Sequence, residues 1–408
     1  MRFGTFYEMQ LPRPWTEESE YDLYQQALDQ VELSDRLGFD YVWEVEHHHL
    51  EEYSHSSAPE VFLAAASQRT KQIRLGHGVM LVPPPYNHPV RCAERIATLD
   101  LISGGRVEFG TGESATMLEM GGFGIDPALK KRMWREAVEQ IANMLVMDPY
   151  PGFDGEFFSM PCRNVLPKPR QKPHPPVWVA CTNPNTIKWA ARHGLGALTF
   201  AFTDPDNMRE WVADYYRILR EECEPVTHVV NPNVAVVTPF SVHEDEDEAI
   251  RRGMDGFRFF QYALIRLAAG NPTRPGNTNL WSDYLESKKQ MNQFDFFTRY
   301  GGIGTPDQVR EHLQGYADAG VDQVIFIQQS GKNTHEHICE SLELFATKVM
   351  DHFKENEADR EAAKHEELAP FIATAFERKN WMEPIAPEAV PEVPSVLAQM
   401  SQQSQATG

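Results

Sequence analysis

The stretch FDYVWEVEHHH, residues 39–49, joins a short run of apolar and aromatic residues to a polar end with three histidines. A short run rich in Val, Tyr and Trp is typical of a buried strand. On both sides the spacing changes to that of amphipathic helices. Residues 17–37 place Leu23 and Val31 on one side, and residues 59–70 form the next helical run. The stretch therefore predicts a strand between two helices.

The same alternation continues along the chain. Eight short β-rich runs, each followed by helical sequence, predict a parallel (β/α)8 barrel. An open doubly wound sheet is the alternative, but eight units in about 350 residues suit closure better. The predicted strands are residues 2–7, 39–46, 73–82, 106–112, 176–181, 197–202, 233–242 and 323–328. The predicted helices are residues 17–37, 59–70, 89–101, 127–147, 185–193, 206–222, 245–267, 305–319 and 334–353.

Three segments interrupt the alternation. Residues 147–176 are rich in Pro, Gly and aromatic residues, which predicts an excursion with a short hairpin before the fifth strand. Residues 270–300 are polar and follow the seventh strand on the side where barrel active sites lie, so they predict a lid. We therefore expect a barrel over residues 1–355 and an extension over residues 356–408, largely disordered after about residue 386.

The composition favours a protein that acts on small molecules or proteins. The 408 residues are 41% hydrophobic, and no window approaches the uninterrupted apolar length of a membrane span. The formal charge of −21 repels nucleic acid and anionic membranes, so neither is an expected partner. The five cysteines are scattered without a CxxC pair, which predicts reduced thiols and no metal site. The start of the chain lacks a signal-peptide pattern, so we expect a soluble cytoplasmic protein.

The histidine run at residues 47–49 is the strongest chemical feature. It follows the second predicted strand at its carboxyl end, where a barrel opens into its active site. A histidine there can act near neutral pH as a base or a hydrogen-bond donor. Adjacent residues of a strand point to opposite faces, so the three histidines cannot share one site. A partly buried structural histidine or weak metal binding by the run is the alternative reading.

Three blocks of the chain resemble, in order, the luciferase-like flavin monooxygenases. They are VWEVEHH at residues 42–48, LGHGVMLVPPPYNHPVRCAERIATLDLISGGRVEFGTG at 75–112, and PPVWVACTNPNTIKWAARHGL at 175–195. The resemblance runs from residue 2 to about residue 353. It implies a (β/α)8 barrel that uses FMN as FMNH2, delivered by a separate NAD(P)H:flavin reductase, together with O2.

The resemblance also implies a catalytic histidine. The family histidine matching His47 lies beside the flavin and supports the C4a-peroxyflavin, which must be kept from water and from early loss of hydrogen peroxide. Glu46 in the same motif is assigned to the cofactor site, and His48 to a structural role. Gly78 and Val79 match the segment where the family often has a non-prolyl cis peptide under the flavin ring.

For the flavin phosphate, the resemblance indicates the turn after the fifth strand and the fourth long helix. Small hydroxyl and amide residues that lead into a helix offer side-chain donors and free backbone NH groups to a dianion. Simple capping of the helix by Asn183 is the alternative, and both roles can coexist. The assigned residues are Cys181, Thr182, Asn183, Thr186 and Arg132.

Two positions depart from bacterial luciferase after the fourth strand. Its thiol position is Gly112 here, and the following arginine is Glu113, which cannot bind phosphate as arginine does. We assign both residues, with Gln329 at the end of the eighth strand, to the substrate side of the site. The lid aromatics Trp281, Phe294, Phe296 and Phe297 favour a small apolar or aromatic substrate, although they could equally pack the lid down.

The predicted reaction is oxygenation of a small organic substrate by a two-component flavin-dependent monooxygenase. No second nucleotide-binding GxGxxG motif follows a strand, so NAD(P)H oxidation is expected on another protein. A deazaflavin (F420)-dependent oxidoreductase of the same superfamily and a non-catalytic flavin-binding protein are the alternatives. Members of this family pair through helices of the first half, which implies a homodimer or a related heterodimer.

Overall fold

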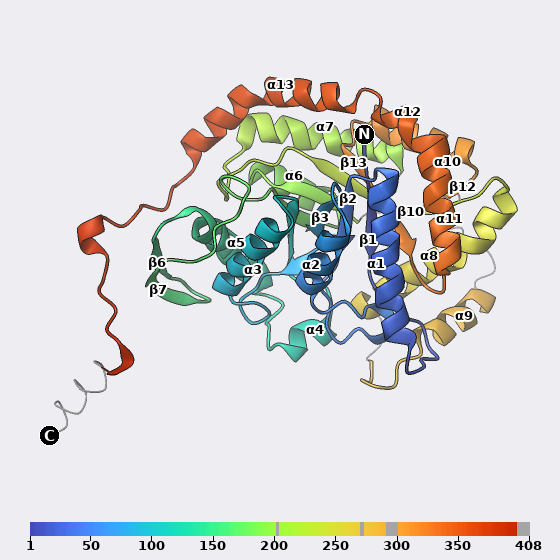
Figure 1. Ribbon diagram of the computed structural model, residues 1–408, viewed down its shortest axis with the longest axis horizontal. Coiled ribbons are helices and arrows are strands. Elements are labelled where there is room, and N and C mark those ends of the chain that lie inside the picture. The colour runs from blue at the N-terminus through green and yellow to red at the C-terminus, as the bar shows by residue number, and fades with distance from the viewer. Residues whose placement is uncertain (201–203, 270–272, 291–300, 398–408) are drawn as a thin grey trace.

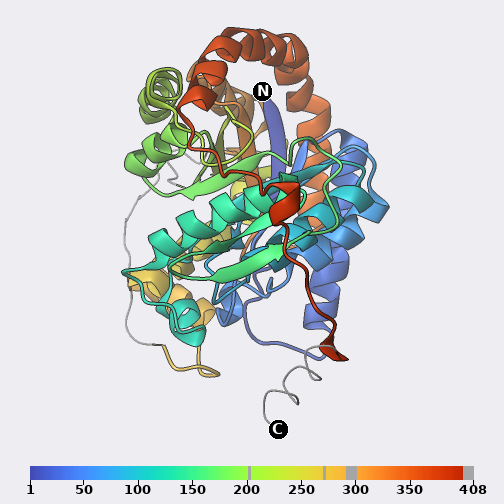
Figure 2. The same ribbon diagram turned by 90° about the vertical axis from the view of Figure 1, so that its left-hand side faces the viewer.

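Eight parallel strands close into a barrel with helices around it in the computed structural model (Figure 1, Figure 2). The structure describes residues 1–200, 204–269, 273–290 and 301–397. The ring runs β1, β2, β3, β5, β8, β9, β10 and β13, and β13 pairs with β1 to complete it. The predicted (β/α)8 barrel is confirmed. The ring strands are β1 (Arg2–Tyr7), β2 (Tyr41–Glu44), β3 (Arg74–His77), β5 (Val107–Gly112), β8 (Val177–Cys181), β9 (Gly196–Thr199), β10 (Val234–Pro239) and β13 (Gln323–Gln329).

The helices begin where the sequence carries start signals. Proline lies in the first turn of α2, α3, α6, α7 and α10, where its missing NH costs no hydrogen bond. Asn183, Asp204 and Thr305 cap α6, α7 and α10 by accepting from backbone NH groups. The helices are α1 (Ser19–Leu37), α2 (Pro59–Arg69), α3 (Pro89–Ile102), α4 (Met117–Gly122), α5 (Lys130–Val146), α6 (Pro184–Arg192), α7 (Pro205–Glu222), α8 (Glu246–Ala269), α9 (Leu280–Gln290), α10 (Pro306–Asp318), α11 (His335–Phe345), α12 (Asp351–Lys354) and α13 (Glu357–Arg378).

Side chains fill the barrel, so the strands enclose a packed core. Phe6, Trp43, Trp178 and Leu198 belong to the apolar cluster inside the barrel, and the rings of Trp43 and Trp178 lie 5.5 Å apart. A Cβ on Gly76 would lie 2.3 Å from the Trp43 ring, so only glycine admits the indole at this height. Alternate strand residues pack outward against the helices in a second cluster. The packed interior leaves the strand ends as the place for a site.

The predicted third strand, residues 73–82, is two strands in the structure. β3 ends at His77, and β4 (Met80–Leu81) begins after a peptide bond between Gly78 and Val79 that is cis. Both strands pair with β5. A Cβ on Gly110 of β5 would lie 1.9 Å from the His77 carbonyl oxygen, so the two backbones approach closely at the break. The prediction of one strand over residues 73–82 was wrong, because the apolar pattern of a sequence does not show where the backbones of two strands approach each other so closely.

The predicted hairpin before the fifth strand is present. β6 (Tyr150–Asp154) and β7 (Ser159–Arg163) pair antiparallel within the excursion. The predicted lid is described only over residues 273–290, and Phe294, Phe296 and Phe297 lie outside the described residues. The described part docks on η1 (Glu51–Tyr53), because Gly276 NH donates to Glu51 at 2.7 Å. Trp281 packs against Phe259 and Tyr284 at ring distances of 5.1 and 5.5 Å.

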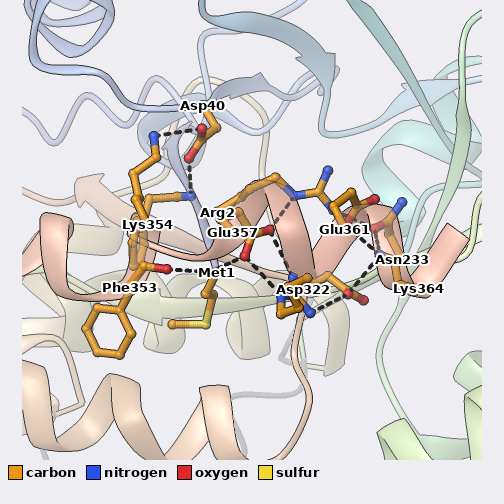
Figure 3. Close-up of polar contacts among 12 residues, drawn as sticks. Met1, Arg2, Asp40, Asn233, Asp322, Phe353, Lys354, Glu357, Glu361 and Lys364 are labelled. Carbon is orange, nitrogen blue, oxygen red and sulfur yellow. Dashed lines mark hydrogen bonds and ion pairs between the residues drawn. The ribbon is translucent and has the colours of Figure 1, made fainter.

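The C-terminal helix α13 packs across the amino end of the barrel (Figure 1). Asp322, at the start of β13, is fully buried and accepts from Lys364 at 3.0 Å and Arg360 at 3.2 Å, both on α13 (Figure 3). It also accepts from Tyr216 Oη at 2.6 Å and from Val234 NH at 2.8 Å. Part of the expected extension is therefore a helix bound to the barrel.

Beyond α13 the chain soon leaves the barrel. Trp381 packs against His228 with the two rings tilted and their centroids 5.1 Å apart, and Met382 contacts Asn143. From residue 386 to residue 397 the described residues are exposed and run away from the barrel (Figure 1).

Within the described ranges, no helix combines the length and apolar character needed to cross a membrane.

Candidate active site at the carboxyl end of the barrel

His47 lies in the loop after β2, with its ring between two buried carboxylates. Its Nδ1 is 2.8 Å from Glu119 Oε1, and its Nε2 is 3.0 Å from Glu8 Oε1. Its backbone NH donates to Ser56 at 2.8 Å, and Glu46 NH donates to Val79 at 3.0 Å, which tie the loop to its neighbours. The His47 side chain remains 22% exposed. An imidazole at this strand end is therefore both fixed and accessible.

The two carboxylates control the charge of the ring. Burial by itself would lower the pKa of His47, but the charges and hydrogen bonds of Glu119 and Glu8 raise it well above its ordinary value. For Glu119 burial opposes ionisation, yet His47, Ser114 and the His48 NH lower its pKa to about 2. Burial raises the pKa of Glu8, and His47 only partly offsets this. The site thus holds an imidazolium beside one firmly ionised carboxylate.

Glu119 is held in place from several directions. It accepts from Ser114 Oγ at 2.6 Å, from Thr116 Oγ1 at 2.9 Å and from His48 NH at 3.1 Å. Thr116 also caps α4 by accepting from Glu119 NH. Because a short helix and its cap fix Glu119, the His47 ring has little freedom to rotate.

The other two histidines have different surroundings. His48 Nε2 contacts Glu46 Oε1 at 3.0 Å, and the His48 ring lies against Phe123 at 4.9 Å. His49 adopts a positive φ of 65°, and its ring also stacks on Phe123. The His48 and His49 rings thus lie 6.1 Å apart against the same phenylalanine. The expected alternation of the three histidines is wrong, because β2 ends at Glu44 and residues 47–49 form a loop.

Glu46 fixes the backbone beside the Gly78–Val79 peptide. One carboxylate oxygen accepts from Leu81 NH at 2.8 Å, and the other accepts from Asn87 Nδ2 at 2.8 Å. The carboxylate therefore holds β4 in position, and Glu46 NH reaches Val79 from the same loop. Glu46 thus fixes the backbone that follows the Gly78–Val79 peptide.

Gly112 and Val79 meet over the apolar interior. A Cβ on Gly112 would lie 2.3 Å from Val79 Cγ2, so glycine is required for Val79 to lie over the end of β5. A Cβ on Gly78 would lie 3.3 Å from Phe6, which places this glycine directly above the interior aromatic cluster. Phe200 packs on Phe6 with ring centroids 5.4 Å apart. The result is an apolar floor at the carboxyl ends of β1, β3 and β5.

The turn after β8 forms a closed capping box. Asn183 accepts from the NH groups of Asn185 and Thr186, and Thr186 Oγ1 accepts from Thr182 NH at 3.2 Å. Cys181 faces the outer core, where burial raises its thiol pKa to about 12. The structure therefore brings Thr182, Asn183 and Thr186 together, and the buried Cys181 thiol meets Thr186 from the core side.

Arg132 and its neighbours on α5 point in different directions. The Arg132 guanidinium pairs with Glu156 on the hairpin excursion and is 59% exposed. Lys130 lies 3.6 Å from Glu113 and donates to the Ser114 carbonyl at 2.6 Å. Burial raises the pKa of Glu113, and the charges of Lys130 and Lys131 oppose this rise. The cations nearest the end of β5 are thus the two lysines.

Gln329 is engaged with the loop after β1. It accepts from Gln10 NH at 3.0 Å and donates to the Gln10 carbonyl at 3.0 Å.

Two surface hollows, of about 460 and 400 Å³, lie along α9 and beside α11, and neither is lined by His47. The position of the candidate site follows from strand polarity and the buried charges, which these hollows do not share.

The sequence analysis missed Glu8 and Glu119. Glu8 continues the inward-facing positions of β1, Gly4 and Phe6, so alternation could have placed it at the mouth of the barrel. Thr116 and Glu119 form a Thr-x-x-Glu pattern that signals a helix start, and we had no reason to link that helix to His47. Only the folded chain brings the two carboxylates to one ring.

Residues 1–323 match the model of the luciferase-like monooxygenase family. The chain belongs to this family and is an oxidoreductase. It is 26% identical over 367 residues to the oxygenase component of the flavin-dependent trigonelline monooxygenase from Acinetobacter baylyi, covering 89% of this chain and 98% of that protein. The family match, residues 1–323, spans both the β1 and β2 ends that carry Glu8 and His47.

Solved structures agree with the fold. The monooxygenase RslO1 from Streptomyces bottropensis has a TM-score of 0.70 at 26% identity, covering 86% of this chain and 100% of that one. An F420-dependent secondary alcohol dehydrogenase has a TM-score of 0.64 at 18% identity, covering 85% of this chain and 98% of that one. The fold is therefore shared by enzymes of different cofactors, and the choice of cofactor rests on the site.

Proposed function

We propose that this protein is the oxygenase component of a two-component FMN-dependent monooxygenase. It takes reduced FMN from a separate NAD(P)H:flavin reductase and uses O2 to oxygenate a small apolar or aromatic organic substrate. The observation that carries the proposal is the His47 imidazolium fixed between Glu8 and Glu119 and packed against Tyr53 of the interior apolar cluster, at the carboxyl end of the barrel. The family match and the relative named as an oxygenase component support it.

The residues at the strand ends suit a flat tricyclic ring. Gly78 and Gly112 carry no side chains that would project from the strand ends, and Val79 offers an apolar surface beside the interior aromatics. Bound reduced FMN would supply the two electrons that reduce O2. His47 would hold a proton at Nε2 close to the reacting oxygen, and Glu119 would keep the ring oriented. An apolar floor excludes water from beneath.

For the phosphate we propose the turn after β8 together with Lys131. β5 and β8 are neighbouring strands, so the end of β5 at Glu113 lies beside the turn at Thr182. The charge of Lys131 acts on Glu113, which places this exposed lysine at the same end. Arg132 was expected to serve here, but its partner in the structure is Glu156. Thr182 and Asn183 add hydroxyl, amide and helix-terminal donors.

The substrate and location remain part of the proposal. Glu113 and Gly112 lie at the mouth and are our candidates for substrate contact, with Gln329 nearby on β13. A reductase that consumes NAD(P)H and five unpaired cysteines both suit the cytoplasm. We expect neither nucleic acid nor membrane among its partners, since the formal charge is −21.

We also propose a homodimer through α2 and α3. Leu101 and Ile102 at the end of α3 are 46% and 48% exposed, and Val61 on α2 is 66% exposed. Ile96 and Leu99 on α3 are buried in the core. Sedimentation that shows only monomer at micromolar protein would contradict the dimer.

The deciding experiment is anaerobic titration followed by oxygen. Purified protein is titrated with reduced FMN, reduced riboflavin and reduced F420, and the FMN complex is then mixed with O2 and a panel of small apolar and aromatic compounds. We expect tightest binding of reduced FMN and incorporation of one oxygen atom into a product. Tighter binding of F420 with hydride transfer and no oxygen uptake would replace the proposal with the deazaflavin alternative. Binding without any oxygen uptake would favour a non-catalytic flavin-binding protein.

A further inference from the structure

The two carboxylates on His47 cannot both be satisfied by a neutral ring. A neutral imidazole carries one NH donor and one acceptor nitrogen, but here each nitrogen faces a carboxylate oxygen, at 2.8 and 3.0 Å. Either the ring is doubly protonated or one carboxyl carries a proton. A histidine in this setting cannot serve as a free base unless its neighbours exchange protons with it.

The two carboxylates differ in how firmly they are ionised. Glu119 accepts from Ser114, Thr116 and the His48 NH in addition to His47. Glu8 is 2% exposed, and beside His47 its polar neighbour is the Tyr53 hydroxyl. Burial opposes the charge of Glu8 more than these contacts support it, which raises its pKa. Glu119 is thus a fixed anion, and Glu8 is the carboxyl that can change its charge.

We propose that Glu8 is a positioning residue that sets the protonation of His47 through Nε2 and returns a proton to it. When His47 gives up its Nε2 proton, the protonated Glu8 carboxyl transfers its own proton to Nε2, which leaves a Glu8 carboxylate and an imidazolium. The oxygen–hydrogen bond of the carboxyl breaks and the nitrogen–hydrogen bond of the ring forms, with no other reactant. The use of this proton in oxygenation rests on the proposed function.

Few other charged groups face this triad of Glu8, His47 and Glu119. Tyr53 on η1 contacts Glu8 and lies 5.7 Å from the His47 ring, with its own pKa raised by burial and by the two carboxylates. Glu44 at the end of β2 is buried, and burial raises its pKa well above the ordinary value. His48 is directed to Glu46. The charge of Glu8 also raises the pKa of Glu44, so the effect of a substitution at Glu8 is followed at His47 itself.

The test is a pH titration of His47 itself, monitored by NMR on histidine-labelled full-length protein without flavin. His47→Gln identifies its signal among the 15 histidines. The His47 midpoint measured is the loss of the last proton from the pair, when Glu8 is already a carboxylate beside the imidazolium. In Glu8→Gln we expect this midpoint to fall by about one pH unit or more, because the amide removes that opposite charge. Glu52→Gln is the matched control, because Glu52 is also buried at this end but binds Arg13 and Leu280. It should leave the His47 midpoint unchanged.

A His47 midpoint in Glu8→Gln equal to that of the wild type would overturn the proposal. If Glu8→Gln does not fold, Glu8→Asp replaces it, because the shorter side chain keeps the charge but moves it away from Nε2. A lowered His47 midpoint in Glu8→Asp would then support the proposal, and a midpoint equal to that of the wild type would overturn it. With flavin and substrate, the pH profile of product formation should shift to lower pH in Glu8→Gln and partly return in Glu8→Asp. The NMR titration needs no reaction, so its result tests the role of Glu8 even if the wild type does not oxygenate any substrate. A wild type that does not oxygenate would count only against the proposed function.

Discussion

The two ends of the barrel treat buried charge in opposite ways. At the amino end Asp322 is fully buried, but Lys364, Arg360, Tyr216 and Val234 NH all donate to it. At the carboxyl end Glu8 is as deeply buried, and it shares His47 with a second carboxylate. A buried charge with a full set of donors stabilises the fold. A buried carboxyl whose charge is contested by its neighbours is suited to proton transfer.

This contrast predicts which substitutions damage stability and which damage activity. The pKa values of the two buried carboxyl groups, Asp322 and Glu8, are also shifted in opposite directions. Burial tends to raise the pKa of Asp322, but Lys364, Tyr216 and Arg360 lower it below the ordinary value. For Glu8 the balance falls the other way, and its pKa is raised. The predictions below run from the largest expected effect to the smallest.

Asp322→Asn should lower the free energy of unfolding by about 3–5 kcal/mol, the usual cost of removing one member of a buried ion pair. Because the folded pKa of Asp322 is depressed, its contribution is present above the unfolded pKa of about 4 and is lost as pH falls through the folded value. The gap between wild type and variant in chemical denaturation should therefore narrow below about pH 4. Asp359→Asn, on the exposed face of α13, is the control. A gap that stays constant with pH would contradict the assignment.

His47→Ala should leave the fold and flavin binding nearly unchanged but lower product per reduced FMN by about a hundredfold, the scale of a positioned acid or base. Hydrogen peroxide should rise in place of product. His48→Ala is the comparison, because His48 supports Glu46 and packs on Phe123. It should affect melting temperature more than product yield. Rapid mixing with oxygen and a peroxide assay measure both, and unchanged coupling in His47→Ala would remove His47 from the mechanism.

Lys131→Ala should weaken binding of reduced FMN by about 1.5–3 kcal/mol, as expected for a charge-assisted hydrogen bond. Riboflavin, which lacks the phosphate, should bind this variant as well as it binds the wild type. Arg132→Ala is the neighbouring control, since Arg132 pairs with Glu156. If Arg132→Ala weakens FMN binding and Lys131→Ala does not, the phosphate cation is Arg132, as the family resemblance first implied.

Ending the chain after residue 386 should change the unfolding free energy by less than about 0.5 kcal/mol, because the described residues beyond it are exposed. Ending it after residue 378 should cost about 1 kcal/mol or more. The shorter form loses the Lys379 bond to the Pro225 carbonyl and the Trp381 contact with His228. Thermal unfolding of the two forms compares them directly, and equal melting temperatures would show that these contacts add nothing.

The sequence by itself determined the barrel, its helix starts and the place of His47. Strand and helix periods are local, and strand polarity assigns the residues after Glu44 to the carboxyl end. Capping patterns at Asn183 and Thr305 are local in the same way. These features need only neighbours within a few positions along the chain.

Only the tertiary structure decided which groups meet His47. Glu8 is 39 positions before it and Glu119 is 72 positions after it, and each arrives from a different strand end. The directions of Lys131 and Arg132, adjacent on α5, depend on which face of the helix meets β5 and which meets the hairpin excursion. Contacts of this kind arise from the closure of the barrel, because closure alone brings distant strand ends into one ring.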